Sequence, residues 1–256
     1  MPLTAGTTDG TRTAGESLFP RLEPLLPSVQ KPIQYVGGEL NSVVKDWDCA
    51  EASETGGPTV RWALMYPDAY EVGLPNQGVQ ILYEVLNERD WIVAERTYAV
   101  WPDMEQVMRD NGIPQFTVDE HRPVRDFDLL GVSFATELGY TNLLTALDLA
   151  GIPLHAADRD ETHPIVLAGG HAAFNPEPIA DFLDAAVLGD GEQVVLAISA
   201  VVREWKAEGR PGAEGRTPRD ELLHWLAASG AVYVPKFYDT EIDPMTRMEV
   251  VTGPKP

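Results

Sequence analysis

The sequence has a single cysteine, Cys49, in 256 residues. One thiol cannot build a disulfide framework or a cysteine-based zinc site. It also cannot hold an iron–sulfur cluster, because such clusters are bound by several cysteine thiolates. The five histidines include no pair with the spacing of metal ligands, such as H-x3-H, so we predict no metal-binding residues in this chain.

Basic residues are also scarce, with 19 lysines and arginines against 40 aspartates and glutamates, and the formal net charge is −21. Such a charge repels phosphate backbones, so we expect no direct binding of nucleic acid. No stretch approaches the roughly 18 to 20 consecutive apolar residues of a membrane span. The first 20 residues lack the apolar core of a signal peptide. We therefore expect a cytoplasmic protein with no membrane partner.

Short apolar runs alternate with segments of helical periodicity over most of the chain. The runs predict buried strands at residues 60–66, 91–97, 129–134, 165–168 and 185–188, the first of them stopped by Pro67. The periodic segments predict helices at 78–88, 102–111, 140–150, 193–207 and 221–229. This order predicts an α/β fold, specifically a flavodoxin-like doubly wound parallel sheet with helices on both faces.

Four parts are predicted along the chain. Residues 1–20, rich in threonine and glycine, are typical of a disordered leader, and residues 21–58 of an extension that packs on the domain. The α/β domain itself spans residues 59–230. Residues 231–256 carry two short apolar runs with no evident pairing partner, so we expect them to begin a β-rich element of a longer protein, of which this chain is a fragment.

The residues that follow the predicted strands are the candidate binding residues, because open parallel sheets bind ligands at the carboxyl ends of their strands. Glycine is frequent there and lets the backbone come close to a flat ligand. The candidates are Asp68, Tyr70, Gly73, Ser133, Glu137, Gly139, Gly169, Gly170, His171, Gly189, Gly191 and Glu192. No catalytic residue is predicted.

The same residues also have ordinary structural explanations. Residues 68–73 have the composition of a polar turn ending in glycine, and His171 that of a hydrogen-bonded loop histidine. At residues 189–192 the two acidic side chains oppose a bound phosphate. A tight turn with acidic groups at a helix start explains this segment better, since they interact favourably with the helix dipole.

Three elements in order resemble a cobalamin-binding domain. Asp68-Ala-Tyr70-Glu-Val-Gly73 has the spacing of D-x-H-x-x-G, the loop with which that family supplies a histidine to cobalt, and Tyr70 stands at the histidine position. Ser133 and Gly169-Gly170 are similar to the serine and Gly-Gly elements around the nucleotide tail of the cofactor. Longer stretches, at 31–48, 131–154 and 164–195, resemble the amino-terminal part of B12-binding-domain radical SAM proteins. The resemblance is to the uncharacterised subfamily in which this domain precedes the radical SAM barrel.

The resemblance implies a domain that cradles a corrinoid, base-off and without a histidine ligand, for radical or methyl-transfer chemistry done by the barrel. It implies cobalamin as the cofactor of the domain, the barrel as a partner in cis, and a [4Fe–4S] cluster and S-adenosylmethionine only in the full-length protein. The cluster motif C-x3-C-x2-C is absent here, so we expect this chain alone to be inactive.

Two other functions stay open. The first is a cofactor-free docking or substrate-recognition module with the same fold, which Tyr70 and the acidic charge favour. The second is a flavodoxin-like FMN domain, which lacks support because no Ser/Thr-rich phosphate loop follows the first predicted strand.

Overall fold

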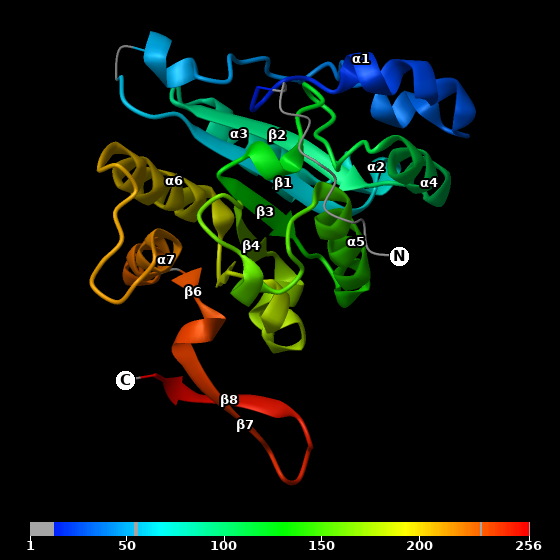
Figure 1. Ribbon diagram of the computed structural model, residues 1–256. Coiled ribbons are helices and arrows are strands. Elements are labelled where there is room, and N and C mark those ends of the chain that lie inside the picture. Colours follow the sequence, from blue (N-terminus) through cyan, green and yellow to red (C-terminus); the bar gives the residue numbers. More distant parts are fainter. Residues whose placement is uncertain (1–12, 54–55, 231, 256) are drawn as a thin grey trace.

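A computed structural model of the chain describes residues 13–53, 56–230 and 232–255. The strands of its main sheet are β1 (Val60–Ala69), β2 (Ile92–Ala99), β3 (Leu129–Ser133), β4 (Ile165–Gly169), β5 (Ala185–Val187) and β6 (Val232–Tyr233). They form one six-stranded sheet in the order β2-β1-β3-β4-β5-β6 (Figure 1). The first five strands are parallel, and only β6 is antiparallel. The predicted parallel sheet is confirmed.

Helices cover both faces of this sheet. The helices on the faces are α3 (Gln77–Asn87), α5 (Tyr140–Ala150), α6 (Gly191–Ala207) and α7 (Pro218–Ala228). The other helices are α1 (Phe19–Leu22), α2 (Tyr70–Gly73) and α4 (Pro102–Asn111). Alternate side chains of β1 point to opposite faces, as in any strand. Trp62 and Leu64 pack in one core with α3, α6 and α7, whereas Ala63 and Met65 pack in a second core with α5. The sheet is therefore doubly wound, as predicted.

Strand β1 continues beyond the residue at which the sequence predicted its end. It runs through Pro67 to Ala69, and its register with β2 shifts between Tyr66 and Ala69. Proline has no N–H to give to a sheet and is tolerated at bulges and strand ends. Because the pairing of β1 with β3 already stops at Met65, this last part of β1 needs partners on one side only.

A third core lies under the N-terminal segment, by which we mean the described residues before β1, 13–53 and 56–59. Leu18 and Leu22 pack there with Met104 and Met108 of α4, and all four side chains are almost fully buried. The leader predicted for residues 1–20 lies largely outside the described residues, but the packed part of the chain begins before residue 20.

The C-terminal residues differ from the expectation that they lack partners. Strand β6 pairs with β5 and so completes the main sheet. The following strands, β7 (Tyr238–Ile242) and β8 (Glu249–Pro254), pair with each other in an antiparallel hairpin that projects away from the sheet (Figure 1). The pairing of β6 with β5 joins segments that only the folded chain brings together, whereas β8 was not predicted because its apolar run is only Val250 and Val251. In the described part of the chain, no helix is both long and apolar enough to cross a membrane.

Candidate functional site

The candidate residues gather at the edge of the sheet where β1 to β5 end, here named the carboxyl edge. Met65 lies opposite Val132 in the register of β1 and β3, and Ser133 lies opposite Gly169 in that of β3 and β4. Asp68 in the last part of β1, Ser133 at the end of β3 and Gly170 directly after β4 therefore lie at the same edge, on three neighbouring strands. The structure brings these three predicted residues together.

Several polar candidates at the carboxyl edge are available to a ligand or partner. Glu137, His171 and Glu192 are exposed, and their side chains make no hydrogen bond or ion pair within the described part of the chain. Asp68 is also exposed, and its Oδ1 accepts only the neighbouring Ala69 N–H, at 2.7 Å. Such side chains can bind a partner without first breaking an internal contact.

Tyr70 behaves differently from these residues. Its hydroxyl donates a hydrogen bond to Glu39 of the N-terminal segment. Its ring packs edge-on against Tyr98 of β2, with 5.5 Å between the ring centroids and 80° between the planes. Burial and the contact with Glu39 raise the pKa of the Tyr70 phenol. Tyr70 is thus held towards β2 as a neutral phenol, and it is not free to serve as a ligand of cobalt.

Five of the six candidate glycines of the carboxyl edge fall into two groups. A Cβ added to Gly73 would lie 2.5 Å from the ring of Tyr98, and one added to Gly139 would lie 2.7 Å from Pro67. Gly170 has φ +89°, and its Cβ would lie 2.6 Å from the carbonyl oxygen of Phe134. These three glycines are required by the protein's own packing. Gly169 and Gly189, by contrast, have no atom within 4 Å of an added Cβ.

Residues 189–192 form the start of α6. Gly189 has φ +126°, a conformation that favours glycine, and Asp190 precedes the first helical residue, Gly191. Glu192 lies in the first turn, where a negative charge interacts favourably with the helix dipole. This geometry agrees with the tight turn expected from the sequence.

The carboxyl edge also carries exposed apolar side chains. One large apolar residue follows each of the five parallel strands, and its exposed fraction lies between 41% and 86%. In strand order β1 to β5 these residues are Val72, Trp101, Leu138, Phe174 and Leu188. We call them the apolar rim. Sequence reasoning missed the rim, because exposure cannot be told from residue type, although four members follow predicted strands and Leu188 is the last residue of one.

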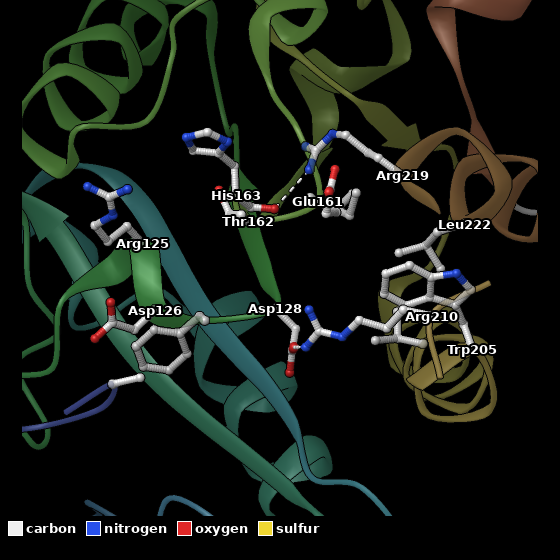
Figure 2. Close-up of a pocket in the computed structure, with 14 residues that line it drawn as sticks. Arg125, Asp126, Asp128, Glu161, Thr162, His163, Trp205, Arg210, Arg219 and Leu222 are labelled. Carbon is white, nitrogen blue, oxygen red and sulfur yellow. Dashed lines mark hydrogen bonds and ion pairs between the residues drawn. The ribbon is translucent and has the colours of Figure 1, made fainter. Parts of the chain in front are cut away.

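A pocket of about 240 Å³ lies at the opposite edge of the sheet, next to the starts of β3 and β4 (Figure 2). Charged side chains of both signs line it, and Figure 2 shows Arg210 reaching towards Asp128. Asp128 is already bound by Lys206 at 2.7 Å, and Arg219 by Asp184 at 2.8 Å. Their charges therefore serve to join α6 and α7 to the residues that precede β3 and β5. No sequence motif marked this pocket, since its walls come from segments that are distant in the chain.

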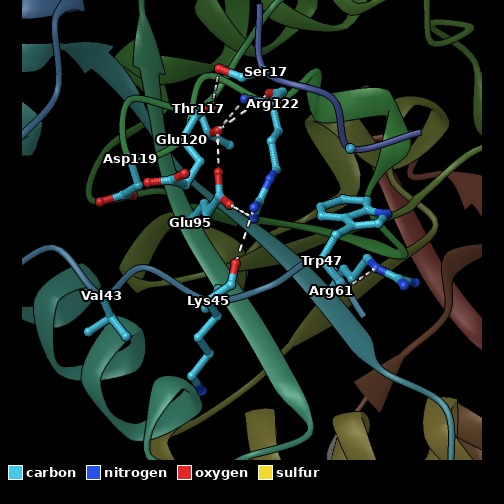
Figure 3. Close-up of polar contacts among 12 residues, drawn as sticks. Ser17, Val43, Lys45, Trp47, Arg61, Glu95, Thr117, Asp119, Glu120 and Arg122 are labelled. Carbon is cyan, nitrogen blue, oxygen red and sulfur yellow. Dashed lines mark hydrogen bonds and ion pairs between the residues drawn. The ribbon is translucent and has the colours of Figure 1, made fainter. Parts of the chain in front are cut away.

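A buried polar cluster along β2 is a second feature that the sequence did not reveal, and Figure 3 shows the part of it around Glu95 and Arg122. Arg96 and Asp119 form an ion pair with 2.7 Å between Nη2 and Oδ1, and both side chains are almost completely buried. Glu95, also buried, pairs with Arg122 and accepts a hydrogen bond from the Thr117 hydroxyl. Burial raises the pKa of Glu95 to about 7, against the opposing effect of Arg122.

This cluster fastens the N-terminal segment to the sheet. The Ser42 hydroxyl donates to Asp119 at 2.9 Å, and Arg122 Nη2 donates to the carbonyl oxygen of Lys45 at 3.1 Å. Strand β2 is at the edge of the sheet, where unpaired backbone groups would otherwise invite association with other chains. At this edge Val118 and Asp119 bond the backbone of Arg96, and the Lys45 ammonium of the N-terminal segment donates to the carbonyl oxygen of Ile92. The N-terminal segment also reaches the carboxyl edge through Glu39 and Tyr70.

The two groups of glycines predict opposite results for neighbouring substitutions. Gly170→Ala should lower the free energy of unfolding by about 2 kcal/mol or more, since it adds a side chain in a strained conformation and against a backbone carbonyl. Gly169→Ala should change it by less than about 0.5 kcal/mol, because the added methyl group meets no atom. Urea denaturation of both variants measures the difference, and equal losses would contradict this assignment.

The raised pKa of Glu95 predicts a dependence of stability on pH. Its folded-state pKa of about 7 exceeds the ordinary value of 4.5, so the folded protein binds more protons between these values. The free energy of unfolding should therefore fall as the pH rises from about 4.5 to about 7. Glu95→Gln should flatten this part of the profile, measured by denaturation at a series of pH values. Glu84→Gln, on the exposed side of α3, is the control and should leave the slope unchanged.

Comparison with known proteins gives one family. The family described as "Radical SAM proteins, N-terminal" matches residues 78–235, more than half of the chain. The match extends from α3 past β6 and so includes β2 to β6 of the main sheet. No curated protein and no solved structure matches the chain. The chain therefore belongs to the family of N-terminal domains of radical SAM proteins.

Proposed function

We propose that this domain docks through its carboxyl edge onto the barrel of a radical SAM enzyme and helps to close the barrel's active site. The observation that carries the proposal is the apolar rim, with one exposed apolar side chain after each parallel strand. Single exposed apolar residues are ordinary on any surface. Five that recur at the ends of adjacent strands, on the edge where such folds bind their ligands, indicate a contact surface.

The composition of the carboxyl edge suits a protein contact. Burying a large apolar side chain fully is worth about 1.5–3 kcal/mol, so the rim offers a substantial driving force. Around it lie polar side chains that have no partners among the described residues, namely Glu137, His171 and Glu192. An apolar centre with a polar margin is the usual anatomy of a protein interface.

The chemistry of the family cannot come from this chain's own residues. The name of the family implies S-adenosylmethionine and an iron–sulfur cluster in its members, and such a cluster needs several cysteine ligands. The chain has only Cys49, a half-buried thiol whose pKa is raised by burial. The residues of this chain therefore cannot hold an iron–sulfur cluster. In the proposal, the role of the domain is to cover the active site of the barrel.

Substitution of two rim residues tests the docking proposal. Leu138→Asp with Phe174→Asp should weaken binding to a radical SAM barrel polypeptide from the same organism at least tenfold, or about 1.4 kcal/mol, because charge replaces apolar contact. Isothermal titration calorimetry with the purified barrel measures the affinity.

The control is Ile242→Asp with Met245→Asp, which changes two exposed apolar residues at the β7–β8 hairpin. This variant should bind as the unaltered chain does. Equal affinity of the rim variant and the unaltered chain would refute docking through the carboxyl edge.

Binding of a corrinoid at the same edge is the second candidate. The adjacent loops of Asp68, Ser133 and Gly169 support it, as does the open space above Gly169 and Gly189, over which a flat ring can lie. The deeper slot for a nucleotide tail does not fit, because Tyr98, Pro67 and Phe134 fill the space beside Gly73, Gly139 and Gly170. Tyr70 is also engaged with Glu39 and offers no ligand to cobalt.

Titration with hydroxocobalamin separates the two candidates. Since the tail slot is filled and Tyr70 is engaged, we expect no change in the corrin absorption bands at high micromolar concentrations of this chain. A saturable shift that Gly169→Leu abolishes would replace the docking proposal with corrinoid binding. The substitution is suited to this test because it fills the open space with little strain.

A further inference from the structure

Three buried oxygen atoms without a hydrogen-bond partner line one small cavity. They are Gln34 Oε1, the Tyr98 hydroxyl and Gln115 Oε1, and their residues are only 5%, 3% and 2% exposed. Among the described residues just one other buried side-chain atom, Arg219 Nε, lacks a partner. Buried polar groups are nearly always hydrogen-bonded in folded proteins, so three such atoms in one place require an explanation.

The orientation of both amides supports this arrangement. Gln115 Nε2 donates to Thr97 Oγ1 at 2.9 Å and to the carbonyl oxygen of Tyr98 at 2.8 Å. Gln34 Nε2 donates to a carboxylate oxygen of Glu71. Turning either amide over would place an oxygen against these acceptors. The two Oε1 atoms are therefore set as acceptors that face the cavity, and Tyr98 supplies a hydroxyl that can donate.

We propose that this cavity holds a single water molecule that is part of the fold. The cavity measures about 10 Å³, which is the space that one water needs, on the order of 10–15 Å³. The water donates its two hydrogens to Gln34 Oε1 and Gln115 Oε1 and accepts one from Tyr98. Three hydrogen bonds are the usual number for a buried water. An ammonium ion fits less well, because it has four hydrogens to donate and only three unpartnered oxygen atoms belong to the residues that line the cavity.

The water joins three segments beneath the carboxyl edge. Gln34 belongs to the N-terminal segment, Tyr98 to β2, and Gln115 to the connection that leads to β3. Through its amide, Gln34 also holds Glu71 of α2, and the Trp101 indole N–H donates to the same carboxylate at 3.4 Å. The water thus helps to fix the β2 end of the apolar rim. That last consequence rests on the proposed function, but the water site itself does not.

The substitution Tyr98→Phe tests for the water, because the melting temperature should change in opposite directions with and without it. If the water is present, the substitution removes one of its three partners, and the melting temperature should fall by about 2–4 °C. If the cavity is dry, the substitution removes an unsatisfied buried hydroxyl, which should stabilise the protein. A melting temperature that is unchanged or higher would therefore overturn the proposal.

The matched control is Tyr66→Phe. Tyr66 lies opposite Tyr98 in the register of β1 and β2, and in the described part of the chain its hydroxyl makes no hydrogen bond. We expect the melting temperature of the Tyr66→Phe variant to stay within about 1 °C of that of the unaltered chain. This change is smaller than the one that the loss of a hydrogen bond would cause.

Two further measurements address the occupant directly. Oxygen-17 relaxation dispersion of the full chain should detect a long-lived internal water whose residence Tyr98→Phe shortens or abolishes. Replacing sodium chloride by ammonium chloride should leave the melting temperature unchanged. A rise that is specific to ammonium and lost in Tyr98→Phe would show an ammonium site and refute the water.

Discussion

The buried pair of Arg96 and Asp119 is the interaction on which the arrangement of this domain depends. Both side chains are almost completely inaccessible to water, and removing one partner from such a pair leaves an uncompensated charge, at a cost of about 3–5 kcal/mol. Arg96 lies on the edge strand β2, and its guanidinium also donates to Ser42 and Asn41 of the N-terminal segment. The charges are fully satisfied only while that segment covers the strand.

Several features of the carboxyl edge follow from this constraint. With the N-terminal segment in place, Glu39 binds the hydroxyl of Tyr70, and Gln34 and Lys31 bind Glu71 of α2. The β2 side of the edge is thus built partly from residues that precede the sheet in sequence. The contact with Glu39 engages Tyr70, which stands at the position where the resemblance to a cobalamin-binding domain expects a metal ligand.

Much of the fold could be predicted from the sequence because it follows from local patterns. The apolar runs at 129–134 and 165–168 are buried on both sides, and such runs indicate strands of a parallel sheet. The apolar pattern did not predict the strand pairings of the C-terminal residues. Val232 joins the sheet through β5, and residues 238–242 find their partner further along the chain, in 249–254. Neither contact leaves a periodic signal in the sequence.

For the candidate site, the sequence by itself determined which strand ends lie together, since parallel strands end at one edge and Asp68, Ser133 and Gly169 lie at or next to the ends of β1, β3 and β4. Only the tertiary structure decided how those residues are used. In the folded chain Tyr70 donates to Glu39, and the backbone of Phe134 occupies the space beside Gly170. Leu138 and Phe174 are exposed. The physical reason is that strand order is a property of the backbone pattern, whereas burial and partners depend on side chains from distant segments that meet only in the folded chain.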